Sequence, residues 1–180
     1  MWFLPRTVGT APVRAQPEVF VRAFARRIEA GLLGPQRSRY AVTRQDQHGL
    51  AFRAVDWPTA LSVGLNDVEL MVSAGQARYA IHYRRWAAYA VALSAAIGVG
   101  SAVLFLALDI RYHVERDVSW MIPGLSTDQN VAIAWSMVVF WGFVWPWILI
   151  GLHKRSLRQL MERLISEVDE IARTQSARLR

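Results

Sequence analysis

Two long stretches without a charged residue constrain this chain more than any other feature. Residues 86–108 and 131–152 contain no Asp, Glu, Lys, Arg or His. Each stretch exceeds the roughly 20 helical residues that cross a hydrocarbon core of about 30 Å. The sequence therefore predicts a multi-pass membrane protein with two spans, at 86–108 and 131–152, that together form a transmembrane hairpin.

The charges outside the two stretches predict the topology. Residues 1–85 hold twelve arginines and six acidic residues, residues 153–180 hold seven basic and four acidic residues, and the loop 109–130 holds two arginines and four acidic residues. Because cytoplasmic flanks of spans are enriched in Lys and Arg, we expect both termini in the cytoplasm and the loop in the periplasm of an inner (cytoplasmic or intracytoplasmic) membrane. Five flanking residues are expected to contact lipid headgroups: Arg84, Arg85, Lys154, Arg155 and Arg158.

The basic composition leaves one other class of partner to consider. A pI near 10.7 is also typical of nucleic-acid-binding proteins. Arginines beside a membrane are attracted to anionic headgroups, however, and no nucleic-acid-binding motif is present. We therefore expect a lipid bilayer and no nucleic acid as a partner. The absence of cysteine excludes disulfides and thiolate metal sites.

The remaining sequence predicts a membrane protein of the α+β class. Residues 1–16 have no apolar period and are expected to form an extended arm, and residues 17–85 a cytoplasmic α+β domain. This domain would begin with an amphipathic helix that repeats Phe20, Phe24, Ile28 and Leu32 and ends at Gly34 and Pro35. Alternating apolar residues then predict a five-stranded antiparallel meander, with strands around Val42, Phe52, Val63, Leu70 and Ile81.

Two turns and the C-terminal segment complete the expected fold. Asn66–Asp67 and Ala74–Gly75 are expected to be tight turns between strands. Residues 153–180 are expected to form a cytoplasmic amphipathic helix that continues the second span and packs on protein, with a stripe of five apolar residues: Leu157, Leu160, Leu164, Val168 and Ile171. In the periplasmic loop 109–130, Ser126 and Gln129 predict a capping box at the start of the second span.

The first span carries two rows of small residues. One row is Ala88, Ala92, Ala96 and Gly100, and the other is Ser94, Gly98 and Ala102. Small residues at this spacing allow a second helix backbone to approach closely. The contacted helix is either the second span alone or, since there are two rows, also a helix of another subunit.

The second span is rich in large aromatic side chains: Trp135, Phe140, Trp141, Phe143, Trp145 and Trp147. Interfacial belts hold Trp near the ends of a span, whereas Trp141 is near the middle of this one. Such rings either face lipid or pack on a pigment, quinone or lipid molecule. No imidazole lies inside a span, so we expect no cofactor held by ligands from this chain.

Candidate catalytic residues are few. Asp46 and His48 share a predicted turn, and His82 lies on the last strand. His113, Glu115 and Asp117 are close in sequence, but only the outer two share a helical face. No HExxH, phosphate-binding loop or nucleophile elbow accompanies them, so we expect neither an enzyme nor a metal site nor a small-molecule substrate.

These observations predict a non-catalytic accessory subunit of a larger inner-membrane complex. The hairpin would brace the transmembrane helices of other membrane subunits, and energy-transducing assemblies, photosynthetic or respiratory, are the expected hosts. The alternative is a membrane-anchored regulatory or adaptor module whose cytoplasmic domain binds a soluble partner. An enzyme or transporter component is disfavoured because two uncharged helices form no pathway by themselves.

Overall fold

The computed structural model describes residues 5–32, 39–117 and 122–178. The chain divides into two compact units, described separately below. The sheet unit comprises residues 1–88 and 151–180, and the hairpin unit comprises residues 89–150.

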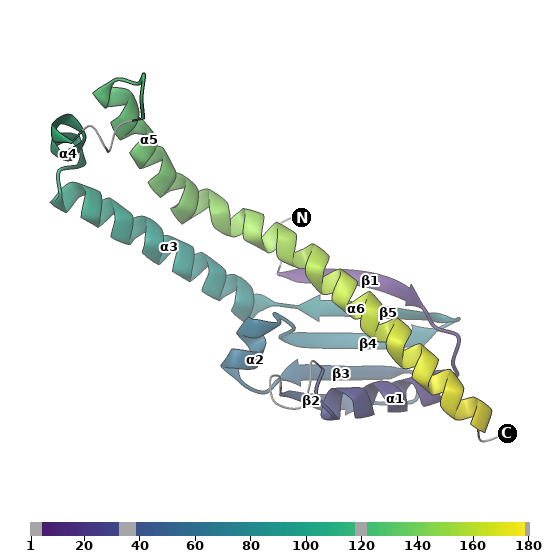
Figure 1. Cartoon of the computed structure of the whole chain (residues 1–180). Coiled ribbons are helices and arrows are strands. Elements are labelled where there is room, and N and C mark those ends of the chain that lie inside the picture. Colours follow the sequence, from purple (N-terminus) through teal and green to yellow (C-terminus); the bar gives the residue numbers. More distant parts are fainter. Residues whose placement is uncertain (1–4, 33–38, 118–121, 179–180) are drawn as a thin grey trace. The chain divides into compact units, whose positions relative to one another are not determined.

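The sheet unit is built on five antiparallel strands in the spatial order β1-β5-β4-β3-β2 (Figure 1). The strands are β1 (Arg6–Pro12), β2 (Tyr40–Gln45), β3 (Gly49–Ala54), β4 (Asp67–Ser73) and β5 (Gln76–His82). Strands β2 to β5 form a meander, and β1 pairs with β5 at the opposite edge, from Arg6 opposite His82 to Pro12 opposite Gln76.

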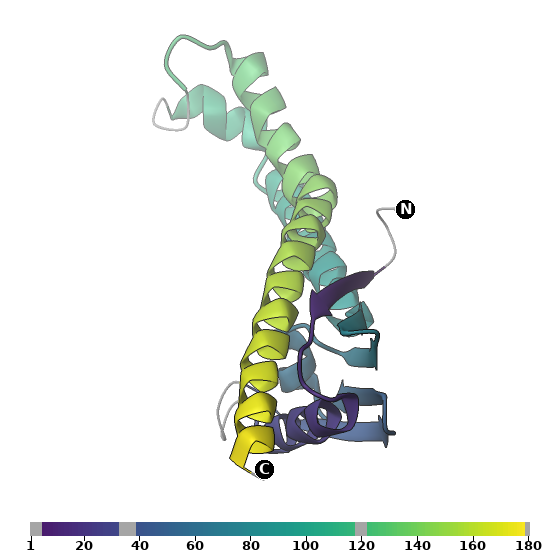
Figure 2. The same cartoon turned by 90° about the vertical axis from the view of Figure 1, so that its right-hand side faces the viewer.

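Two helices cover the same face of this sheet, α1 (Pro17–Glu29) and the C-terminal part of α6 (Trp145–Arg178), as the two views in Figures 1 and 2 show. Strand β4 shows the alternation that results, because Val68, Leu70 and Val72 are buried, whereas Glu69 and Met71 are exposed. Helix α1 buries three large residues of its predicted apolar stripe: Phe20, Phe24 and Ile28.

The prediction of a five-stranded antiparallel sheet is confirmed, but one of its strands was assigned wrongly. The apolar residues around Val63 do not form a strand. The residues before Val63 form a short helix instead, α2 (Trp57–Ser62), and Val63 is its C-cap. The helix begins at Trp57 because the side chain of Asp56 accepts a hydrogen bond from Thr59 N at 2.8 Å and Pro58 occupies the first turn. The fifth strand is instead β1, which comes from the segment expected to be an arm.

The two predicted turns have opposite outcomes. Ala74 and Gly75 do form the two-residue turn between β4 and β5, with φ of +50° and +73°. The Asn66–Asp67 turn is wrong, since Asn66 is a buried residue and Asp67 begins β4. The first helix ends earlier than expected, because α1 stops at Glu29 and does not include Leu32. Gly34 and Pro35 themselves lie outside the described residues.

The C-terminal part of α6 buries a stripe that differs from the predicted one. Leu157, Leu164 and Val168 are buried as expected, but Leu160 is only half-buried and Ile171 is 40% exposed. The helix is rotated so that Met161, Ile165 and Ala172 complete the buried face. Polar contacts support this packing, including an ion pair of 3.3 Å between Arg27 of α1 and Glu167.

The hairpin unit contains the apolar helices. Helix α3 (Arg84–Ala107) is followed by α4 (Ile110–Arg116), α5 (Thr127–Val139) and a π-helical turn, Phe140–Val144, that leads into α6. Asp109, with φ of +44°, separates α3 from α4. The predicted capping box is confirmed: Ser126 Oγ accepts from Gln129 N, and Ser126 N donates to Gln129 Oε1.

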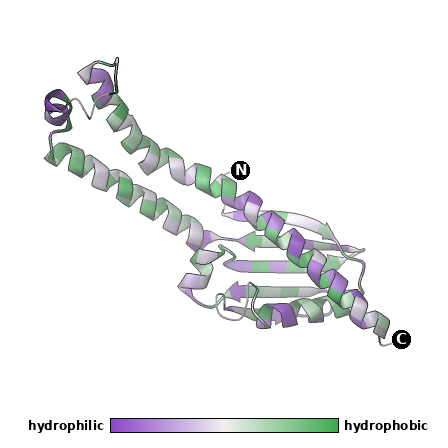
Figure 3. Ribbon diagram, in the orientation of Figure 1, coloured by the Kyte–Doolittle hydropathy of each residue, from purple (hydrophilic) through white to green (hydrophobic). Residues whose placement is uncertain are grey.

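Two helices are long and apolar enough to cross a membrane, α3 and the continuous helix Thr127–Ala177. In Figure 3, hydrophobic residues dominate α3 and the first part of the second helix, whereas the C-terminal part of α6 mixes hydrophilic and hydrophobic residues. Only 17% and 22% of their most apolar windows are buried within the chain. They therefore present apolar surface outward, unlike the core helices of a water-soluble domain.

Candidate functional site

The two long helices of the hairpin unit contact each other through one of the two small rows. Gly98 and Ser94 are buried in this contact, and a Cβ added to Gly98 would lie 2.7 Å from Gly142 Cα. A side chain at position 98 would therefore force the backbones apart, and a Cβ added to Gly142 would also be tight, at 3.1 Å from Gly98 Cα. The row containing Gly98 faces the second apolar helix of the same chain, a contact that both interpretations of the sequence include.

The other small row does not take part in this contact. Ala88, Ala92, Ala96 and Gly100 are all exposed. Among the described residues, nothing lies within 4 Å of a Cβ added to Gly100. This row therefore lies on an exposed side of α3.

Some of the predicted aromatic residues contact other rings and some are exposed, and Trp141 does both. Trp135 faces Phe105 of α3 with its ring edge-on, the centroids 5.9 Å apart. Phe140, Trp141 and Trp145 form a cluster in which the Trp141 and Trp145 rings are 4.8 Å apart. The outward members are Trp141, Phe143 and Trp147, with exposed fractions of 43%, 65% and 47%.

Pro146 explains the π-helical turn beside this cluster. Proline has no N–H and its ring clashes with the carbonyl four residues earlier, which belongs to Gly142. The preceding residue, Trp145, donates its N–H to Phe140 O, five residues earlier. The turn widens the helix where Gly142 meets Gly98, and π-helical turns of this kind are frequent at functional sites.

Asn66, which the sequence analysis expected only in a tight turn, has a different role. Its side chain is buried, and its Oδ1 accepts from the backbone N–H groups of Arg85 at 2.7 Å and Trp86 at 3.4 Å. Its Nδ2 donates to Ala60 O at 2.9 Å. Asn66 therefore caps the start of α3 and ties that helix to α2, a role that only the tertiary structure reveals.

His153 likewise lies in surroundings that the sequence did not predict. Its ring stacks on Trp86, with centroids 3.7 Å apart and planes 7° apart, and meets Tyr83 edge-on. Its buried Nε2 has no hydrogen-bond partner among the described residues, and a Cβ on Gly64, whose φ is +79°, would collide with it. Burial lowers the pKa of His153 to about 4, so the ring is neutral at physiological pH.

The basic residues expected at lipid headgroups have different surroundings. Arg84, Arg85 and Arg155 are exposed, and Lys154 is half-buried. Arg158 donates from Nη2 to the carbonyl of Val8 on β1, at 3.3 Å. Arg158 thus has a contact within the sheet unit, while the exposed arginines remain accessible from outside.

Two of the candidate residues, Asp46 and Glu115, take part in ion pairs or hydrogen bonds within the chain. Asp46 accepts a hydrogen bond from the backbone N–H of His48 at 3.0 Å and pairs with Arg44 at 2.9 Å, and both interactions hold its pKa below the usual range. Glu115 pairs with Arg111. Within the described ranges, no three metal-ligating side chains gather in one place.

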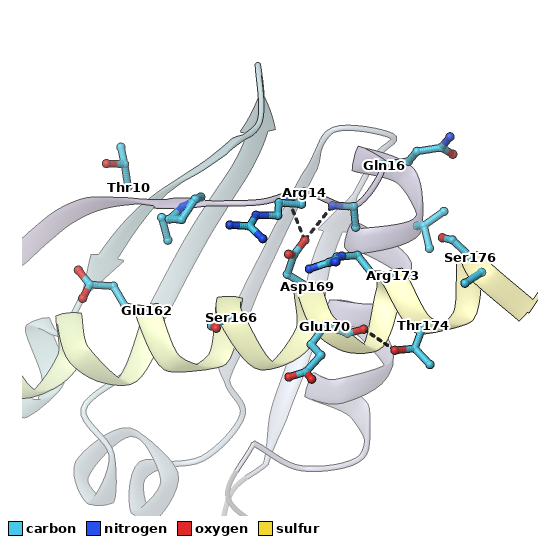
Figure 4. Close-up of a pocket in the computed structure, with 15 residues that line it drawn as sticks. Thr10, Arg14, Gln16, Glu162, Ser166, Asp169, Glu170, Arg173, Thr174 and Ser176 are labelled. Carbon is cyan, nitrogen blue, oxygen red and sulfur yellow. Dashed lines mark hydrogen bonds between the residues drawn. The ribbon is translucent and has the colours of Figure 1, made fainter.

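An open groove of the sheet unit lies between the segment after β1 and the last turns of α6 (Figure 4). Asp169 of α6 is 8% exposed and accepts hydrogen bonds from the backbone N–H groups of Arg14 and Ala15, both at 2.9 Å. The groove carries both signs of charge, contributed by Arg14, Glu162, Asp169, Glu170 and Arg173.

The comparisons with known proteins give no assignment. No family model matches the chain, and no curated protein or solved structure matches it. The features available for a functional proposal are therefore the uncovered faces of the apolar helices, the aromatic cluster and the groove.

Proposed function

We propose that this chain crosses the membrane twice, with both termini in the cytoplasm, and serves as a non-catalytic accessory subunit of a larger membrane complex. The observation that carries the proposal is the uncovered apolar surface of the hairpin, since most of both apolar windows is not buried by the chain itself. The absence of ionisable side chains from both stretches favours a packing role over an ion or proton pathway.

The two uncovered faces suit different neighbours. The row ending at Gly100 has no side chain larger than a methyl group, which suits a transmembrane helix of another subunit. The outward rings of Trp141, Phe143 and Trp147 offer broad apolar surfaces, which suit lipid tails or a flat ligand such as a pigment or quinone. An energy-transducing complex, photosynthetic or respiratory, supplies both kinds of neighbour and is the host class that we propose.

Purification of the tagged chain from its own membranes in a mild detergent tests this proposal. We expect a native particle larger than the monomer, with other membrane polypeptides identified by mass spectrometry and, for a pigmented host, an absorption band in the visible range. A homogeneous monomer without co-purifying membrane proteins would contradict the proposal.

The groove between β1 and α6 favours a second candidate function. Its exposed Arg173 and Glu170 flank the anchored Asp169 and would suit an extended polar segment of a soluble protein. The chain would then be a membrane-anchored adaptor. Capture of one soluble cytosolic protein by the intact chain, lost in the double variant Arg173→Ala, Glu170→Ala, would favour the adaptor over the accessory subunit.

A further inference from the structure

The short helix α2 presents an apolar side chain to the outside of the sheet unit. Trp57 and the preceding Val55 are each 57% exposed. The turn beneath them is fixed, because Asp56 caps the helix, Thr59 and Ala60 are buried, and Thr59 Oγ1 accepts a hydrogen bond from Arg39 N at 3.0 Å. A large ring held outward on a rigid turn is typical of a contact surface.

Trp57 lies where the chain leaves the sheet unit for the first apolar stretch. The guanidinium carbon of Arg85 is 5.8 Å from the centroid of the Trp57 ring, a cation–π geometry, and Arg85 immediately precedes that stretch. The strand register places Arg53, Asp67 and His82 at this same end of the sheet, because Asp67 pairs with both other residues and β5 ends at His82. Ser73 and Gln76 mark the opposite end of the same strands, about 20 Å away at roughly 3.4 Å per residue.

The charges at this end favour an anionic partner. This end of the sheet unit carries five exposed arginines but only two aspartates, Asp56 and Asp67. Its histidine, His82, is half-buried. Guanidinium groups bind phosphate oxygens in a bidentate manner, and indole rings prefer the headgroup region of a bilayer. The five arginines are Arg6, Arg39, Arg53, Arg84 and Arg85.

We propose that Val55, Trp57 and Arg85 form a contact with the headgroups of anionic phospholipids at the surface of the membrane that α3 enters. The contact rests on the proposed membrane crossing of the two apolar stretches. It would fix the α2 end of the sheet unit at the bilayer surface, with Arg85 shared between the Trp57 ring and a lipid phosphate.

The absence of cysteine from the chain allows this contact to be measured directly. A spin label on Val55→Cys in the full chain is placed in nanodiscs of phosphatidylcholine with phosphatidylglycerol, and its collisions with oxygen and with a water-soluble nickel complex are compared. Ser73→Cys, also exposed, is the matched control at the far end of the sheet, and Phe143→Cys reports on the hairpin.

We expect the Val55 label to be protected from the nickel complex, with the Ser73 label in water and the Phe143 label in the bilayer. An arginine near an anionic surface contributes about 1 kcal/mol to membrane binding. Arg85→Gln should therefore lower about fivefold the ratio of conformations in which the α2 end contacts the headgroups to those in which it does not. Nanodiscs of phosphatidylcholine alone should also weaken the protection. Trp57→Cys provides a second labelling position should Val55→Cys perturb the turn.

Three results would overturn the proposal, and they are distinguishable. A Val55 label as accessible to nickel as the Ser73 label, with the Phe143 label in the bilayer, would remove the lipid contact and leave the membrane crossing intact. A Phe143 label in water would contradict both the lipid contact and the membrane crossing. The third result is a Val55 label that is protected only in discs that hold two chains, whatever the lipid charge. That result would show that the surface binds a second copy of this chain and not lipid.

Discussion

At the scale of single residues, Asn66 makes the clearest structural contribution. It satisfies two backbone donors at the start of α3 and the carbonyl of Ala60 from a buried position. Asn66→Leu would leave all three groups without their partner, so we expect a loss of about 1–3 kcal/mol in the unfolding free energy of the sheet unit. Denaturant unfolding followed by circular dichroism measures this loss. Thr43→Ala, at an exposed position on β2, should change the unfolding free energy by less than about 0.5 kcal/mol. Equal effects of the two variants would contradict the assigned role.

His153 gives the sheet unit a pH dependence. Burial lowers its pKa from 6.5 to about 4, so between these values the unfolded chain binds a proton that the folded chain does not. The unfolding free energy should therefore fall as the pH drops from about 6.5 to about 4, and be insensitive to this group above that range. Thermal melts across this range measure the slope.

His153→Phe is the matched variant, because it keeps an aromatic ring against Trp86 without a titratable nitrogen. We expect its melting temperature to depend less on pH over the same interval. An unchanged slope in the variant would mean that other groups cause the acid sensitivity.

At the scale of elements, the contact between the two hairpin helices depends on the close approach of Gly98 and Gly142. Gly98→Leu would force the two backbones apart, and we expect it to destabilise the hairpin by roughly 1–3 kcal/mol, the usual cost of overpacking. Gly100→Leu adds the same side chain to the same helix where the described residues leave open space. It should leave hairpin stability unchanged or slightly raised. Unfolding in mixed micelles compares the two variants, and equal destabilisation would disprove the assignment of the faces.

The elements also indicate how far the sequence predicts this fold. The apolar stretches, the Ser126 capping box and the Ala74–Gly75 turn follow from local rules, and all three are present in the structure. Strand β1 could not be predicted, because it has no apolar alternation and is held by pairing with β5, some seventy residues later in the chain. Asp56 and Pro58 are a local signal for α2, but the apolar alternation from Leu61 to Leu65 competes with it and favours a strand.

The candidate site was predictable to a smaller extent. Small residues at the helix contact and outward aromatic rings were expected from composition, but only the structure separates the Gly98 row, which is covered, from the Gly100 row, which is exposed. The roles of Asn66 and His153 arise from contacts between distant segments. No local pattern reports such contacts.

At the scale of the whole molecule, the proposed topology predicts two distinct labelling patterns. Pro123→Cys lies in the loop between the apolar stretches and Ser73→Cys lies in the sheet unit, and both positions are exposed. In intact cells with a permeable outer membrane, a membrane-impermeant maleimide should label Pro123→Cys, whereas Ser73→Cys should react only after lysis. The reverse pattern would place the termini outside the cytoplasm.

The central claim is that the uncovered side of α3 is covered by another polypeptide in the native membrane. The most direct measurement is the mass of the native particle purified with the wild-type chain and with Gly100→Leu, compared with Val103→Leu as a control that also changes an exposed position of the same helix. We predict that Gly100→Leu releases the chain as a folded monomer, whereas the other two remain in a larger particle. Particles of the same mass and composition from all three, or monomers from all three, would contradict the account.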